Sequence, residues 1–219
     1  MKGSEMFDLF KRKKGQPDPV EGDPSMFAGF LEYFGEAPVF VGGATDPYDA
    51  FIDSLGGRSF GDGVFRVFER GDLERWHRVV SGCFTKLRGE FNLIGYDWMG
   101  RCFAVDQRDG DGKGLVVLLA TLDMYYIEKD VSAFLNEVMP NQSEACLEVG
   151  RYREWLEGHA PVGRMECVGY KVPLFLGGED SLENMEVSDM EVYWDMTDQL
   201  WEAVKDLPEG TKIGNVSFE

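Results

Sequence analysis

Apolar residues recur along the chain at two spacings, and these spacings predict its elements. Repeats of three and four residues indicate helices, and alternating or β-branched runs indicate strands. The predicted helices are Met26–Phe34, Pro47–Leu55, one from Asp72 to about Phe84, Val131–Val138, Ser143–Gly158 and one that starts at Ser188 and ends before Leu207. The predicted strands are Val64–Phe68, Phe91–Trp98, Arg101–Gln107, Leu115–Leu122 and Met124–Ile127, with a closing strand at Thr211–Phe218.

Turn residues between the central strands predict how these strands pair. Met99-Gly100 is typical of a tight hairpin, and Arg108–Gly114 is long enough for a wider one. Consecutive strands joined by short loops favour an antiparallel meander. The fold class is therefore α+β, a central mostly antiparallel sheet flanked by helices, with an N-terminal helical subdomain and a C-terminal helix.

Capping residues fix the expected ends of several helices. Ser25, Asp46 and Asp72 are predicted N-caps, and Pro47 suits the first helical position. Ser188 and Glu191 have the spacing of a capping box. An apolar stripe of the last helix is expected to face the core, with members Val192, Met196, Leu200 and Val204.

The stretch Val168–Gly178 cannot be a helix, since it contains Pro173 and ends in a Gly-Gly pair. It is predicted to be a short buried strand or an extended turn. Two aromatic clusters also stand out, Tyr96-Asp97-Trp98 at the end of a predicted strand and Tyr193-Trp194 in the last predicted helix. Alternation puts Tyr96 and Trp98 on one face and Asp97 on the other. Both aromatic clusters suit either core packing or an interface.

The net charge of the chain indicates which kinds of partner it can bind. Forty acids against 22 Lys and Arg give −18, and from Phe175 to Glu219 there are 12 acids and two bases. Such a field repels nucleic acid and anionic membranes, and it attracts cationic proteins. No stretch is long and apolar enough for a membrane helix, and no signal peptide is recognisable, so a cytoplasmic location is expected.

No motif of catalysis or of metal binding is found in the sequence. The cysteines Cys83, Cys102, Cys146 and Cys167 are widely spaced, and no ligand pattern with histidine occurs, so reduced thiols and no zinc are expected. Asp106, Asp109 and Asp111 resemble part of a calcium loop, but Val117 stands where the bidentate glutamate would be. A hairpin turn explains these aspartates better. Neither a cofactor nor a metal is expected.

Three stretches together carry a family resemblance. They are Phe60–Phe68 leading into Trp76-His77, then Gly95–Asp106, and finally Gly169–Gly178 with Asn184, Asp189, Tyr193, Trp194 and Gln199. In order and spacing the chain resembles bacterial proteins with an N-terminal GAD-like domain and a C-terminal domain of the type VI secretion DNase-immunity kind. Residues 1–24 are expected to be a disordered tail, because a basic run followed by glycines and prolines cannot bury enough apolar surface. The resemblance implies a GAD-like region at 25–107 and an immunity-type region at 108–219, with both regions packed as one body.

The function implied by this resemblance is that of an immunity protein and not of an enzyme. Such a protein binds and neutralises a cognate secreted toxin, here expected to be a basic nuclease. The expected contact surface is acidic, with Glu179, Asp180, Glu183 and Glu186 and, from the aromatic stretch, Asp97 and Trp98. The basic run Lys11–Lys14 departs from this pattern.

Two other functions suit the same sequence. One is a metal-binding or ligand-binding module, or an enzyme, with an acidic cleft. The other is an adaptor of the same family that has no toxin. Metal-dependent thermal stabilisation would distinguish the first, and a gene with no toxin gene beside it would indicate the second.

Overall fold

The computed structural model describes residues 22–23, 26–39, 41–42, 46–110, 112–120, 122–208 and 210–211. The predicted tail at 1–24, the Ser25 cap, Asp111 and the closing strand lie wholly or almost wholly outside these residues. The strands are β1 Gly22–Asp23, β2 Val41–Gly42, β3 Ser59–Phe60, β4 Phe65–Val67, β5 Phe91–Asp97, β6 Cys102–Asp106, β7 Leu115–Leu118, β8 Met124–Ile127, β9 Glu166–Tyr170 and β10 Met185–Asp189. The α-helices are α1 Ala28–Tyr33, α2 Pro47–Leu55, α3 Leu73–Cys83, α4 Val131–Ala133, α5 Met139–Asn141, α6 Ser143–Leu147, α7 Val149–Leu156 and α8 Met190–Val204.

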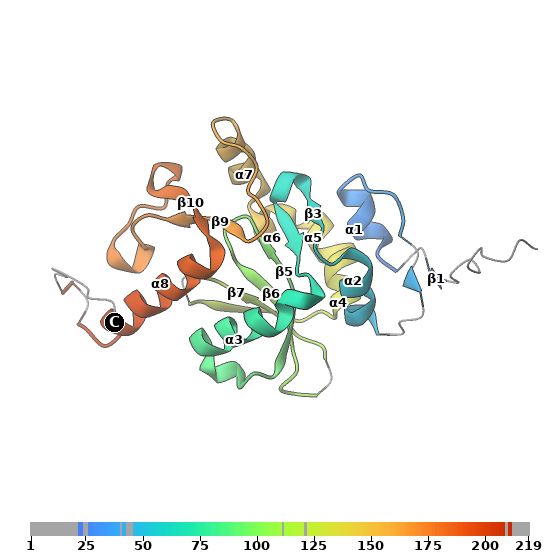
Figure 1. Cartoon of the computed structure of the whole chain (residues 1–219), viewed down its shortest axis with the longest axis horizontal. Coiled ribbons are helices and arrows are strands. Elements are labelled where there is room, and N and C mark those ends of the chain that lie inside the picture. The colour runs from blue at the N-terminus through green and yellow to red at the C-terminus, as the bar shows by residue number, and fades with distance from the viewer. Residues whose placement is uncertain are drawn as a thin grey trace, which may run out of the picture.

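A six-stranded antiparallel meander in the order β3-β4-β5-β6-β7-β8 forms the centre of the fold. The α+β class and the meander are confirmed. Two further two-stranded sheets, β1-β2 and β9-β10, are antiparallel as well. Figure 1 shows α1, α2 and α4 toward one end of the molecule, and α8 with the β9-β10 hairpin toward the other.

Each face of the central sheet carries its own apolar cluster. One cluster joins the sheet to α1, α2 and the segment from α4 to α7. The other joins it to α3 and α8 through Trp76, Val80, Met190 and Trp194. Neighbouring strand residues such as Val116 and Val117 belong to different clusters, as expected for side chains that alternate across a sheet.

The helix caps agree with the prediction at only one of the three described sites. The Asp46 carboxylate accepts from the amides of Tyr48 and Asp49 at 2.9 and 3.1 Å, so that cap is confirmed. Asp72 makes no capping bond, because its carboxylate is paired with Arg164. Asp189, not Ser188, caps α8, because the chain stays in β10 through Asp189.

Two predicted helices are interrupted. The helix predicted at Val131–Val138 is a short α4 followed by a π-helical segment, Phe134–Val138, and then α5. The helix predicted at Ser143–Gly158 is broken at Glu148, which has φ 50° and separates α6 from α7. The strand predicted at Leu115–Leu122 ends at Leu118, because Leu119 N–H bonds to the Asp123 carbonyl and closes the hairpin to β8.

Candidate partner-binding site

The stretch Val168–Gly178 begins in β9 and continues as a loop that a single side chain organises. Asn184 accepts from the Val172 amide at 3.0 Å and donates to the carbonyls of Val172 and Glu179, both at 2.9 Å. Its own carbonyl accepts from the Lys171 amide at 2.8 Å. These bonds close the loop between β9 and β10 into a compact unit.

Two glycines of this stretch are required by close contacts. A Cβ atom on Gly178 would overlap the carbonyl oxygen of Val172, and one on Gly169 would overlap the Tyr193 ring. Tyr193 also accepts the Tyr170 amide at its hydroxyl, at 3.2 Å. The residues that carry the family resemblance therefore dock the hairpin onto α8 and shape its loop.

An ionic chain connects this loop to the middle of the central sheet. Asp180 accepts from the Tyr170 hydroxyl and pairs with Arg151 of α7, both at 2.6 Å. Arg151 also lies 3.3 Å from Glu148, which pairs with Arg101 at 2.7 Å. The Tyr170 hydroxyl and the Arg151 guanidinium both lower the pKa of Asp180. Asp180 is consequently ionised and fixed in place at neutral pH.

The four acidic residues predicted for partner binding all lie on or beside this hairpin. Glu179, Glu183 and Glu186 are exposed, and Asp180 keeps 61% of its side chain exposed despite its two partners. The structure thus groups them on one accessible segment. Their role in binding stays a prediction.

The other two predicted contact residues, Asp97 and Trp98, have no exposed surface. Asp97 pairs with Arg101 at 2.5 Å and accepts from the amides of Met99 and Arg101. Trp98 donates its indole N–H to the Leu147 carbonyl at 2.8 Å. Assigning these two side chains to a partner surface was wrong, because both are used inside the fold.

The expected alternation around Asp97 was wrong as well. Tyr96 belongs to the cluster on the α3 and α8 face, and Trp98 belongs to the opposite one. The pairing register shifts between Leu93 and Gly95, and β5 ends at Asp97, so Trp98 lies in the turn. The period of two does not extend past the end of a strand.

Helix α8 adds an acidic surface that the sequence reading did not single out. It contains four acids and no base. These acids, Glu191, Asp195, Asp198 and Glu202, recur at steps of four, three and four residues and so lie along one face of the helix. The signal was present in the sequence as this spacing, but the apolar stripe beside it was favoured instead.

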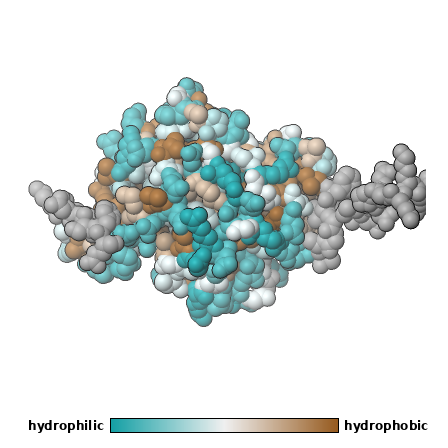
Figure 2. Space-filling model, viewed as in Figure 1, coloured by the Kyte–Doolittle hydropathy of each residue, from teal (hydrophilic) through white to brown (hydrophobic). Residues whose placement is uncertain are grey.

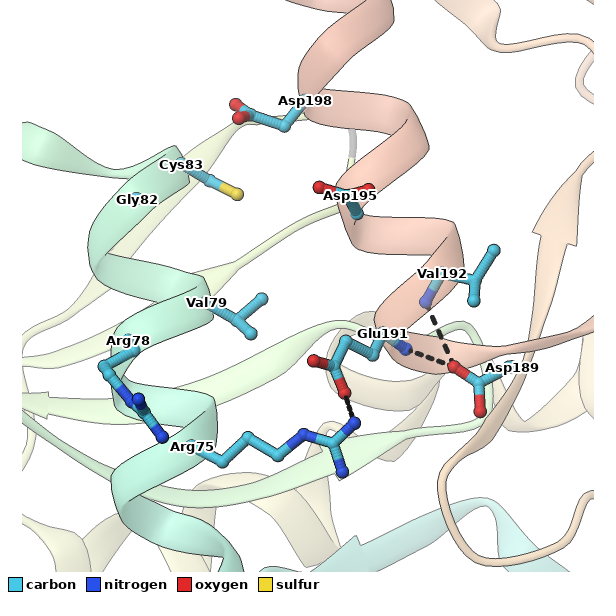
Figure 3. Close-up of a pocket in the computed structure, with 10 residues that line it drawn as sticks. All are labelled: Arg75, Arg78, Val79, Gly82, Cys83, Asp189, Glu191, Val192, Asp195 and Asp198. Carbon is cyan, nitrogen blue, oxygen red and sulfur yellow. Dashed lines mark hydrogen bonds and ion pairs between the residues drawn. The ribbon is translucent and has the colours of Figure 1, made fainter. Parts of the chain in front are cut away.

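This acidic face borders a groove of about 620 Å³ between α3 and α8. Figure 3 shows Asp195, Asp198 and Cys83 toward one end and Arg75, Arg78 and Glu191 toward the other. Arg75 pairs with Glu191. Figure 2 shows that hydrophilic side chains cover most of the face that carries the two helices.

Carboxylates at the far end of the groove repel each other. Burial and then the charge of Glu202 raise the pKa of Asp198, and Asp195 acts in the same direction. Burial and the Asp198 charge raise the pKa of the neighbouring Cys83 thiol to about 12. Cys83 is therefore a neutral thiol, and the surplus negative charge is favourable for a cation.

The predicted core stripe of α8 is wrong, since Val192 and Met196 are 52% and 45% exposed. Met190, Trp194 and Thr197 are buried instead. Trp194 determines which face is buried, because it donates to the Gly100 carbonyl at 2.8 Å and packs against Trp76. Val192 and Met196 thus add exposed apolar surface beside the acidic face.

Asp106 and the four cysteines were the described residues considered for metal or redox chemistry. Asp106 pairs with Arg108 at 2.5 Å. The four cysteines are free, with Cys102 and Cys167 buried. Within the described ranges no group of three His, Cys, Asp or Glu side chains is placed to hold a metal ion. In the same ranges no helix has the length and apolar character needed to cross a bilayer.

Comparison with known proteins places part of this geometry in a family. Residues 128–201 match the family model described as T6SS immunity protein Tdi1, C-terminal. The match supports a domain of the type VI secretion immunity type in this part of the chain. The match covers about a third of the chain and includes the β9-β10 hairpin and most of α8.

The solved structure "Crystal structure of Atu4351 from Agrobacterium tumefaciens" is similar at 13% identity, with 84% of this chain and 85% of that chain covered and a TM-score of 0.48. No curated protein matches the chain at a significant level.

Proposed function

We propose that this protein is a non-enzymatic immunity protein that binds and neutralises a cognate type VI toxin in the cytoplasm of the producing cell. The match of residues 128–201 to the immunity family carries the proposal. We extend it to the target, a nuclease with a cationic surface, and to a division into a GAD-like region at 25–107 and an immunity-type region at 108–219.

Charge supports the choice of target. A nuclease presents cationic groups to the phosphates of its substrate, and these groups are complementary to an inhibitor of charge −18. Attraction between opposite fields accelerates association and depends strongly on ionic strength. The inhibitor would need no catalytic group of its own.

The proposed contact surface runs from the hairpin loop across α8. Glu179, Glu183 and Glu186 supply charge on the hairpin, and Asp195 and Glu202 supply it on the helix. Glu186 and Met196 line a common crevice, so the two parts are adjacent. Exposed Val192 and Met196 supply the apolar area that an interface core needs.

The test measures binding to a catalytically inactive toxin encoded by the neighbouring gene, at low and at high salt. The variant Asp195→Asn with Glu202→Gln removes two charges from α8. The control Glu32→Gln with Glu90→Gln removes two exposed charges elsewhere, one of them on α1. We expect the α8 variant to associate about tenfold more slowly, with a weaker salt dependence, and the control to associate at nearly the original rate.

Three results would each contradict a separate part of the proposal. If the chain binds the toxin neither at low salt nor at high salt, the immunity function is refuted. Equal slowing in the two variants would refute the α8 surface. If this protein binds the toxin and the active form of that toxin shows no activity in a nuclease assay, the choice of a nuclease as target is wrong.

A further inference from the structure

The outer edge of β8 has no strand partner among the described residues. β8 is the last strand of the central sheet and pairs only with β7. Leu119 N–H bonds to Asp123 C=O at 3.0 Å. In an antiparallel pair every second residue bonds to the neighbouring strand, so Tyr125 and Ile127 are the β8 residues that bond to β7. The backbone groups of Met124 and Tyr126 therefore point away from the sheet.

Two large aromatic side chains lie on this edge strand. Tyr125 and Tyr126 are 58% and 52% exposed, and Tyr125 has the highest exposure among the large apolar and aromatic residues that the structure describes. Tyr126 is held by the Arg108 guanidinium, which donates to its hydroxyl at 2.5 Å. Natural sheets usually protect such an edge with a bulge, a proline or a covering element. β8 has no proline, and its pairing with β7 is regular.

A pocket of about 390 Å³ lies beside this edge. Its apolar wall is formed by β7, β8 and the helical segments that follow, with Val117, Leu119, Tyr125, Ile127, Val138, Ala145 and Cys146. Arg101 also lines it, with its charge paired to Asp97 and Glu148. An added strand places alternate side chains on each face of a sheet, so one of them would enter this pocket.

Charge distinguishes between the possible occupants of the edge. From Asp123 to Glu148 the chain has six acids and one base, a local charge of −5. Two copies paired through β8 would bring these charges together, which opposes self-association. A segment that carries Lys or Arg on either side of an apolar residue would be attracted instead.

We propose that β8 is a docking edge for an extended segment of the toxin, which adds a seventh strand to the central sheet. This inference rests on the proposed function. The toxin segment bonds to the outward amides and carbonyls of Met124 and Tyr126 and places an apolar side chain in the pocket. Its flanking basic residues face Glu128 and Glu137, which are both exposed.

The test compares Tyr126→Pro with Tyr126→Ala in the full chain, with the inactive toxin of the neighbouring gene as the probe. Both variants lose the aromatic ring and the Arg108 contact. Only Tyr126→Pro also loses the outward N–H, and it loses no bond to β7 because that N–H faces away from the sheet. We expect the proline variant to bind at least tenfold more weakly than the alanine variant.

A second pair of variants keeps the test decisive if the proline variant fails to fold. Ala145 is exposed and lines the pocket, so Ala145→Trp fills the pocket from a helix surface without changing the strand. We expect at least tenfold weaker binding for Ala145→Trp than for Ala145→Ser. Circular dichroism establishes that each variant is folded.

Other outcomes would overturn the inference in distinguishable ways. Suppose that the unaltered chain binds the toxin, that Tyr126→Pro binds as tightly as Tyr126→Ala, and that Ala145→Trp binds as tightly as Ala145→Ser. The docking edge is then wrong, while the immunity function stands. If the unaltered chain does not bind at all, both proposals are wrong. A homodimer in light scattering that Tyr126→Pro abolishes would assign the edge to a second copy instead.

Discussion

Arg101 pairs with Asp97 across 2.5 Å, and the Asp97 side chain has no exposed surface. Burial raises the pKa of Asp97, and Arg101 together with two backbone amides opposes this rise. A buried carboxylate is stable only with such partners. The pair also begins the ionic chain that leads through Glu148 and Arg151 to Asp180.

Replacing Asp97 should therefore be costly. In Asp97→Asn the Arg101 guanidinium keeps its charge and loses its buried partner, so we expect the free energy of unfolding to fall by about 3–5 kcal/mol. Asp53→Asn is the control, since its pair with Arg70 is more than half exposed and is worth under about 1 kcal/mol. Urea unfolding at neutral pH measures both, and equal losses would show that the Asp97 pair has no special weight.

Asn184 is predicted to hold the hairpin loop. Asn184→Ala removes three hydrogen bonds to Val172 and Glu179, and we expect a loss of about 1–3 kcal/mol. Hydrogen exchange at the Val172 amide should also accelerate. Asn141→Ala, which removes one exposed bond to Glu137, should leave that amide unchanged. Unchanged exchange at Val172 in Asn184→Ala would contradict the assignment.

Gly178 should not tolerate a side chain. A Cβ atom at this position would overlap the Val172 carbonyl oxygen, so the backbone would have to move. We therefore expect Gly178→Ala to lower the free energy of unfolding by about 1–3 kcal/mol. Gly158→Ala is the matched control, because a Cβ there meets open space. The two thermal unfolding curves decide the matter, and similar midpoints would refute the steric argument.

The carboxylates of the groove give a pH dependence. The pKa of Asp198 is raised in the folded chain, so the folded state binds its proton more tightly than the unfolded state does. Stability then falls as pH rises through the interval between the ordinary pKa of Asp and the raised one. Asp198→Asn should raise the melting temperature at pH 7, and the gain should shrink when the pH falls below the ordinary value. A gain that grows on acidification would contradict the sign.

Cys83 should react slowly with thiol reagents. Its pKa of about 12 leaves almost no thiolate at neutral pH, and the thiolate is the reactive form. Alkylation of Cys83, followed by peptide mass spectrometry, should accelerate about tenfold per pH unit from pH 8 to pH 10 without a plateau. In the unfolded chain the rate should level off near the ordinary thiol pKa of about 8.5. A plateau near pH 9 in the folded chain would refute the raised pKa of Cys83, which burial and then the Asp198 charge produce.

The meander could be predicted because its evidence is local. Strand residues alternate, and turn residues such as Met99-Gly100 lie where the chain reverses. The cap at Asp46 was equally local, since Pro47 and the following amides are neighbours in sequence. Information of this kind is contained in a few consecutive residues.

Several of the failures depend on residues distant in sequence. Asp72 is not a cap because Arg164 attracts its carboxylate. Val192 and Met196 are not core residues because Trp194 turns α8 toward Trp76 and Gly100. Trp98 is not on the surface because the Leu147 carbonyl, 49 residues away, binds its indole inside. Only the assembled fold brings these partners together.

The location of the candidate site could be predicted only in part, because some of its residues are neighbours in sequence and others are not. Glu179, Asp180, Glu183 and Glu186 are close in sequence, so their shared location on one loop followed directly from the chain. The groove between α3 and α8 joins segments that are more than a hundred positions apart. Nothing in either helix alone specifies that partner.

Trp98 connects residues 128–201, which match the family model, to the rest of the chain by hydrogen bonds. Its indole donates to Leu147, its carbonyl accepts from the Val168 amide at 2.8 Å, and its amide donates to Val64. Leu147 and Val168 lie within residues 128–201, whereas Val64 and Trp98 precede them. Recombination between related genes that imported only the 128–201 segment would have to preserve both attachments to the resident tryptophan. The groups that bind Trp98 from this segment, the Leu147 carbonyl and the Val168 amide, are main-chain atoms, so an imported segment would have to keep its backbone path beside Trp98 while its side chains could differ.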